Sequence, residues 1–111
     1  MQYLLLIYED EKRFADGYPQ NELAEYMAFG QSHAAKIKSG HALHPTSAAK
    51  TTRVRSGETR TTDGPFAETK EQLGGFYVVE ASSAEEAASI AADIPAARYG
   101  SVEVRPIMVF S

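Results

Sequence analysis

The spacing of hydrophobic residues predicts a strand followed by a helix in the first third of the chain. Residues 2–8 are apolar at nearly every position, which is typical of a central strand with both faces covered. The acidic, glycine-containing stretch 9–19 has no period and predicts a loop. Apolar or small residues then recur at helical spacing from Leu23 onward. We expect a helix that has Asn21 as its N-cap and ends at Gly40.

The middle of the chain predicts two kinds of strand. Threonine-rich runs at 51–55 and 58–62 flank Ser56-Gly57 and predict a β-hairpin. Both runs are polar, so we expect the hairpin to project from the core or to lie against a partner. Residues 73–80 predict a further strand, with a bulge at Gly74-Gly75 near its start.

A second helix and a last strand complete the pattern. Ser83 and Glu86 form a capping-box sequence that predicts a helix start, and Pro95 closes this helix. Alternation of apolar and polar residues predicts a final strand over residues 102–110. The order strand-helix-strand-strand-helix-strand, with an extra hairpin, indicates an α+β ferredoxin-like fold with an antiparallel sheet. No linker or repeat divides the chain, so we expect one domain over residues 1–111.

The predicted sheet has more apolar surface than two helices can cover. Residues 3–8 and 76–79 are apolar on both faces of their strands. Two helices cover only one face of such a sheet, and a second copy of the chain is the simplest cover for the other. We therefore expect a homodimer packed sheet to sheet.

Composition and charge narrow the possible functions. The 111 residues carry a net charge of −4, and 43% of them are hydrophobic, as expected for a folded core. The chain has no cysteine, which excludes disulfides, thiol catalysis and cysteine-bound zinc. The N-terminal apolar run is too short for a membrane span and has no basic flank, so we expect a cytoplasmic protein without a membrane partner. The acidic balance argues against a nucleic-acid partner.

One run of the chain has a long and specific resemblance to a known family. Residues 63–76, DGPFAETKEQLGGF, resemble the signature of the DGPF family within the YCII-related superfamily. Residues 100–106 and 1–8 resemble its closing motif and opening strand, so the resemblance covers essentially the whole chain. It implies a ferredoxin-like, dimeric α/β-barrel fold. It also implies an association with genes for extracytoplasmic-function sigma factors, while more distant superfamily members act as small-molecule lyases or dehalogenases.

The resemblance also directs attention to a histidine and an aspartate, because the shorter YCII proteins carry a suspected His-Asp pair. The nearest positions here are His33 and Asp93. Their spacing departs from that pattern: His33 lies closer to Gly40, and Ile94 separates Asp93 from the following proline. His33 is a candidate general base, because imidazole titrates near neutral pH, or else a packed residue at the edge of the helix.

The family motif itself holds the main catalytic candidates. Asp63, Glu68 and Glu71 lie within nine residues, together with Lys70. Crowded carboxylates can raise one pKa and so create a proton carrier near neutral pH. The alternative is structural: Asp63 can cap the turn that follows it, and Glu68 can form an ordinary ion pair with Lys70 or Arg105.

Arg105, Lys70 and Phe66 are the candidate substrate-binding residues. An arginine fork on the last strand can hold a substrate carboxylate, although it can equally pair with a motif carboxylate. The Phe66 ring can also serve to anchor the turn. His41 and His44 are separated by two residues in a predicted strand ending at Pro45. This spacing places them on opposite faces, so we expect no metal site.

Two functions follow from these observations. The first is a small-molecule-binding or enzyme-like homodimer, of the lyase or isomerase type, with an acid-base pocket at residues 63–71 that takes a small anionic ligand. The second is a non-catalytic sensor or accessory protein, in agreement with the sigma-factor association that the resemblance implies. No cofactor motif is present, and the sequence names no substrate.

Overall fold

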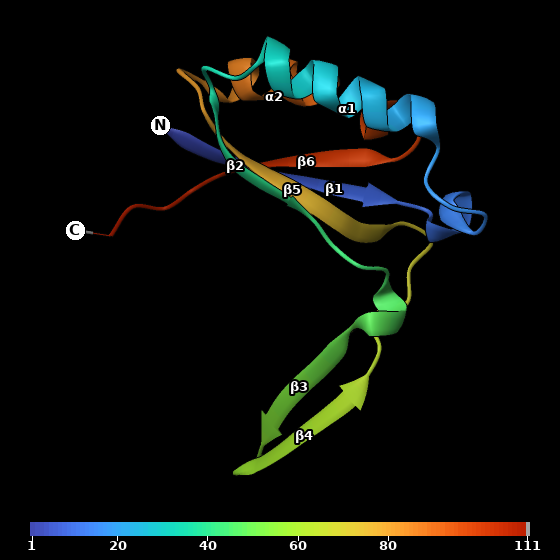
Figure 1. Cartoon of the computed structure of the whole chain (residues 1–111). Coiled ribbons are helices and arrows are strands. Elements are labelled where there is room, and N and C mark those ends of the chain that lie inside the picture. The colour runs from blue at the N-terminus through green and yellow to red at the C-terminus, as the bar shows by residue number, and fades with distance from the viewer. Residues whose placement is uncertain (111) are drawn as a thin grey trace.

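The computed structural model describes residues 1–110 and shows an α+β fold (Figure 1). Four antiparallel strands form the main sheet in the order β2-β5-β1-β6. They are β1 (Gln2–Glu9), β2 (Ile37–Ala42), β5 (Gln72–Glu80) and β6 (Ser101–Pro106). β1 therefore lies between β5 and β6, and β2 is an edge strand. This order confirms the predicted ferredoxin-like fold.

β1 is the centre of the sheet, as its apolar sequence predicts. It pairs antiparallel with β5 on one side and with β6 on the other. Because strand side chains alternate between faces, Tyr3, Leu5 and Ile7 share one face and are buried there. They form the core with residues of β5 and the second helix, among them Val79 and Ile90.

Two helices, α1 (Gln20–Ser32) and α2 (Ala84–Ala92), lie on the same face of the sheet (Figure 1). The Ser83 hydroxyl caps α2 by accepting a hydrogen bond from the Glu86 amide at 3.1 Å. The Glu86 carboxylate in turn accepts from the Ser82 amide at 2.9 Å. The predicted helix start is therefore confirmed. Three short 3₁₀ helices complete the helical segments: η1 (Glu11–Phe14), η2 (Thr46–Ala48) and η3 (Pro95–Arg98).

The prediction of one long first helix ending at Gly40 is wrong. The N-cap residue of α1 is Pro19, not Asn21, and the helix ends at Ser32. The chain then turns and forms β2. Ile37 continues the helical spacing in sequence but pairs with β5 in the sheet, because ladder hydrogen bonds outweigh the local pattern. A Cβ atom on Gly40 would lie 2.5 Å from a Tyr77 ring carbon, so this glycine permits close packing within a strand.

Two strand ends also differ from the prediction. β6 ends at Pro106, so residues 108–110 are outside the sheet, whereas the prediction ran to Phe110. Proline has no amide hydrogen for the ladder, and only the amide of Ile107 still bonds to the first strand. β2 ends at Ala42, which leaves His44 in a loop. The bulge is confirmed, because the register of β1 and β5 skips Gly74.

The polar hairpin is confirmed and stands apart from the sheet. It consists of β3 (Lys50–Arg55) and β4 (Glu58–Asp63), which pair only with each other. Figure 1 shows it on the side of the sheet opposite the helices. Within residues 1–110, neither main helix has the length and apolar content needed to cross a bilayer.

Candidate functional site

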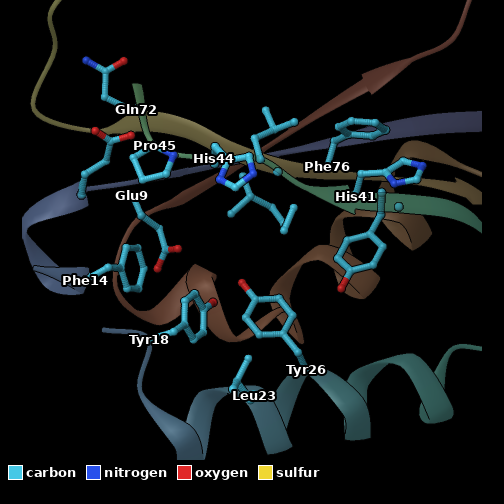
Figure 2. Close-up of a pocket in the computed structure, with 18 residues that line it drawn as sticks. Glu9, Phe14, Tyr18, Leu23, Tyr26, His41, His44, Pro45, Gln72 and Phe76 are labelled. Atoms are coloured by element: carbon cyan, nitrogen blue, oxygen red, sulfur yellow. The ribbon is translucent and has the colours of Figure 1, made fainter. Parts of the chain in front are cut away.

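A cavity of about 550 Å³ lies between α1 and the β2–β5–β1 part of the sheet (Figure 2). Near the C-terminal end of α1, the buried Phe29 ring lies 5.1 Å from the Tyr77 ring. Closer to the N-terminal end, Leu23 lines the cavity and remains 46% exposed. The apolar and aromatic side chains on the helix-covered side are those of Ile7, Phe14, Tyr18, Leu23, Tyr26 and Tyr77. The lining side chains with polar groups include those of Glu9, Glu11, His44 and Gln72.

Aromatic rings form one wall of the cavity. Phe14 and Tyr18 stack with centroids 4.8 Å apart and an angle of 4°, and Tyr26 meets Tyr18 edge to face at 6.5 Å. Burial raises the pKa of both the Tyr18 and the Tyr26 phenol. Both hydroxyl groups therefore stay protonated at neutral pH and can donate hydrogen bonds to a ligand. The wall favours a flat ring that carries oxygen atoms.

Glu9 supplies a buried carboxyl group to the same cavity. It is the last residue of β1, on the helix-covered face, and is only 6% exposed. The turn of η1 returns Arg13 to it, with the guanidinium 2.6 Å from a Glu9 oxygen and 2.6 Å from an oxygen of the equally buried Glu22. The other Glu22 oxygen has no hydrogen-bond partner among residues 1–110. The Arg13 guanidinium also lies over the Tyr99 ring, 3.9 Å from its centre.

Two carboxylates share one guanidinium in this cluster, so its charges do not balance. Burial raises the pKa of Glu9; Arg13 opposes this effect, while Glu22 and then Glu71 add to it. A carboxyl group with a raised pKa can accept and return a proton near neutral pH. Glu9 is therefore a buried carboxyl group on the cavity wall whose pKa lies above its ordinary value.

The 63–71 motif begins at the last residue of the hairpin, Asp63, and none of its residues lines this cavity. The Asp63 carboxylate is 86% exposed and lies 2.7 Å from the Lys50 ammonium group. Glu68 and Lys70 are exposed as well, and Phe66 is 81% exposed. The structure does not bring these side chains together around a common space.

The two remaining candidate residues, Glu71 and Arg105, lie apart from the exposed motif residues and from each other. Glu71 is half-buried, accepts a hydrogen bond from the Ser101 hydroxyl at 2.8 Å, and lies close enough to Glu9 to influence its pKa. Arg105 is exposed and alternates with Val104, so it projects from the helix-free face of the sheet, away from the cavity. In the part of the chain that the structure describes, no ion pair joins Arg105 to a motif carboxylate.

The comparison with protein families assigns the chain. Residues 1–111 match the YCII-related domain. The chain belongs to the YCII-related family. An uncharacterized protein of Rhizobium meliloti (strain 1021) is 38% identical over 99% of this chain and 94% of its own length.

A solved structure shares the YCII-related chain's fold. It is the 5-chloro-2-hydroxyhydroquinone dehydrochlorinase TftG of Burkholderia phenoliruptrix AC1100, in complex with 2,5-dihydroxybenzoquinone. The match has a TM-score of 0.60 at 17% identity and covers 97% of this chain and 94% of the other. At this identity the likeness shows the fold alone.

The YCII-related chain does bring His33 and Asp93 together. His33 Nε2 lies 2.9 Å from Asp93 Oδ2, where the C-terminal ends of α1 and α2 meet. The pair opens on a second, shallower hollow of about 320 Å³, which Arg98 and Glu25 also line. This hollow is separate from the Glu9 cavity and shares none of its lining residues.

Sequence reasoning missed Glu9, Arg13 and Glu22 in the YCII-related chain. The signal was present: Glu9 continues the buried series of alternate β1 residues that begins at Tyr3. A carboxylate at a buried strand position requires a partner or a function. Among residues 1–110, the structure contains no group of three histidine or acidic side chains that could hold a metal ion.

Proposed function

We propose that this YCII-related protein is an enzyme-like homodimer that binds a small, flat, hydroxylated ring in the cavity between α1 and the sheet. The observation that carries the proposal is the buried Glu9 carboxyl group on the wall of an aromatic-lined cavity of about 550 Å³. The dehydrochlorinase of the same fold holds a ligand of this class, 2,5-dihydroxybenzoquinone. Few small-molecule sites need more than an apolar cleft with a few well-placed polar groups.

The proposed chemistry is proton transfer. The ring stacks on the aromatic wall, and the Tyr18 and Tyr26 hydroxyl groups donate hydrogen bonds to its oxygen atoms. The Glu9 carboxylate accepts a proton from a ring hydroxyl or ring carbon, which leaves a neutral carboxyl group and a ring anion. The same carboxyl group returns the proton at another atom of the ring, or a leaving group departs from the anion. This scheme fits an isomerase or a lyase.

The family motif has a supporting place in this proposal. Glu71 acts through Glu9, because its negative charge raises the Glu9 pKa. Asp63, Glu68, Lys70 and Phe66 are exposed, so a catalytic or substrate-binding role for them requires a second subunit that closes over the motif. The same condition holds for a role of Arg105 in holding an anionic ligand. His33, paired with Asp93, would belong to a separate site.

The helix-free face of the sheet supports a homodimer. Leu4, Leu6, Phe76 and Val78 lie on this face by strand register and are half-buried without a helix above them. A second copy placed sheet to sheet would remove these side chains from water, which is the main driving force for association. The two copies would then present their Arg105 side chains close to the shared interface.

Thermal unfolding with and without ligand tests the proposed binding site. The probe is 2,5-dihydroxybenzoquinone, measured with the wild type, Glu9→Gln, Tyr26→Phe and a Glu85→Gln control on the exposed surface of α2. At about 100 times its dissociation constant, a ligand adds roughly 2.7 kcal/mol to the stability of the native state. We expect this stabilisation in the wild type and the control, and a smaller one in both cavity variants.

Equal stabilisation in all four proteins would place the ligand elsewhere and overturn the proposal. A parallel Glu68→Gln, Glu71→Gln variant tests the motif, since an unchanged turnover would remove both carboxylates as proton carriers. Stoichiometric binding without chemical conversion of the ligand would favour the second function, a non-catalytic sensor or accessory protein.

A further inference from the structure

The β3–β4 hairpin is a projecting arm with a fixed base. No residue from Lys50 to Asp63 is buried, and the two strands pair only with each other. The base is held by the Gly64 amide, which donates to the Ala49 carbonyl at 2.8 Å. Glu11 of the main body also accepts two hydrogen bonds from Thr46, at 2.8 and 2.6 Å. An isolated two-stranded hairpin is marginally stable in water, so an arm of this length needs a surface to lie on.

The two faces of the arm differ in chemistry. On one face Thr52 pairs with Thr61 through their hydroxyl groups at 2.9 Å, and Val54 stands opposite Thr59. On the other face, Arg53 stands directly opposite Arg60. Like charges at directly opposite strand positions destabilise a hairpin.

The unbalanced arginines point to an acidic surface outside the arm. Arg60 has only a long contact of 3.5 Å with Glu58, and Arg53 has no carboxylate within ion-pair distance among residues 1–110. Residues 50–63 carry four basic and two acidic side chains, a net charge of +2, whereas the whole chain carries −4. The rest of the chain therefore has a net charge of −6, and its own charge complements that of the arm.

We infer that the arm clasps a second copy of this chain. The inference rests on the proposed homodimer. Figure 1 shows the arm on the same side as the helix-free face that carries Leu4, Leu6, Phe76 and Val78. A second subunit placed on this face lies between the sheet and the arm. The arm then brings its arginines to the acidic body of the partner, and two-fold symmetry repeats the contact.

The test compares dimer dissociation constants by analytical ultracentrifugation at low and high salt. Arg53→Glu, Arg60→Glu keeps a like-charge pair across the strands but reverses the charge of the arm. The single variant Arg60→Glu creates an opposite-charge pair, which should stabilise the hairpin itself. Lys12→Glu, on the exposed surface of η1, changes the net charge as much as the single variant does and is its control.

We expect both arm variants to weaken the dimer, by about tenfold or more for the double variant, because rim and arm charges steer and hold association. The control should dimerise as the wild type does, and added salt should reduce the difference. A wild-type dimer with unchanged arm variants would overturn the clasp but leave the homodimer standing. A monomeric wild type at micromolar concentration would overturn both, and binding of the arm to another protein would then be the remaining reading.

Trypsin gives a second readout that does not depend on changing the arm's charge. The enzyme cleaves after lysine and arginine, and the arm has exposed sites at Lys50, Arg53, Arg55 and Arg60. In a clasped dimer we expect these sites to be cleaved slowly above the dissociation constant and quickly after dilution below it. Cleavage at the same rate at both concentrations, with the wild type still dimeric, would contradict the clasp.

Discussion

Gly100 holds the end of β1 in place behind the cavity, and Gly100→Ala tests how tightly it does so. A Cβ atom at this position would run into the Tyr8 carbonyl oxygen and would lie 3.1 Å from both Cα and Cγ of Glu9. These neighbours are mostly backbone atoms of a paired strand, which cannot rotate away. The Gly100 amide also donates to the Ala96 carbonyl at 2.7 Å, so the residue cannot retreat without losing that bond.

We expect Gly100→Ala to lower the free energy of unfolding by about 1 to 3 kcal/mol, the usual cost of overpacking. For a domain of this size, that lowers the midpoint of thermal unfolding by roughly 4 to 24 °C. The assay is calorimetry or circular dichroism beside Gly74→Ala, where a Cβ atom meets nothing within 4 Å. A Gly100→Ala midpoint equal to that of the wild type, or to that of this control, would show that close packing of Gly100 against Tyr8 and Glu9 does not contribute to stability.

Three further perturbations probe the cavity and the frame around it. Burial raises the pKa of Glu9, so the folded protein takes up this proton at a higher pH than the unfolded chain, whose carboxyl has a pKa near 4.5. The stability of the wild type relative to Glu9→Gln should therefore rise as pH falls from the raised pKa towards 4.5, and parallel stability curves would refute this. Ser83→Ala removes the α2 cap and should lower the free energy of unfolding in urea by about 0.5 to 2 kcal/mol. Ser89→Ala, inside α2, is the control, and an equal loss there would show that the cap is not the cause. Ile94→Ala removes a side chain that is 1% exposed and should cost about 2 to 5 kcal/mol, and a small loss would mean that the core collapses around it.

Local signals in the sequence were sufficient for much of the fold. The apolar run of β1, the capping box at Ser83 and the turn at Ser56-Gly57 each act through neighbours in the chain, and each was predicted correctly. The start of β2 was not, because Ile37 fits a helical spacing and becomes a strand residue only through its pairing with β5. Such pairing joins segments far apart in sequence, so the local spacing of apolar residues does not predict it.

The site was harder to predict than the fold, because closeness in sequence was read as closeness in space. The motif carboxylates lie on an extended, exposed stretch, where Asp63 faces solvent and Glu71 lies near Ser101. The cluster that does form joins Glu9 and Glu22 through Arg13, from three different elements. The buried position of Glu9 at the end of β1 could be predicted from strand alternation, but its pairing with Arg13 could not.

The central claim is that the cavity beside Glu9 is the ligand site, and a nuclear magnetic resonance titration with 2,5-dihydroxybenzoquinone tests it most directly. The account predicts saturable shift changes that cluster on residues lining the cavity, such as Glu9, Tyr18, Tyr26 and Gly75. The same titration of Tyr26→Phe should show weaker binding at the same place. Shift changes that centre instead on His33 and the hollow beside α2, or no saturable change at all, would contradict it.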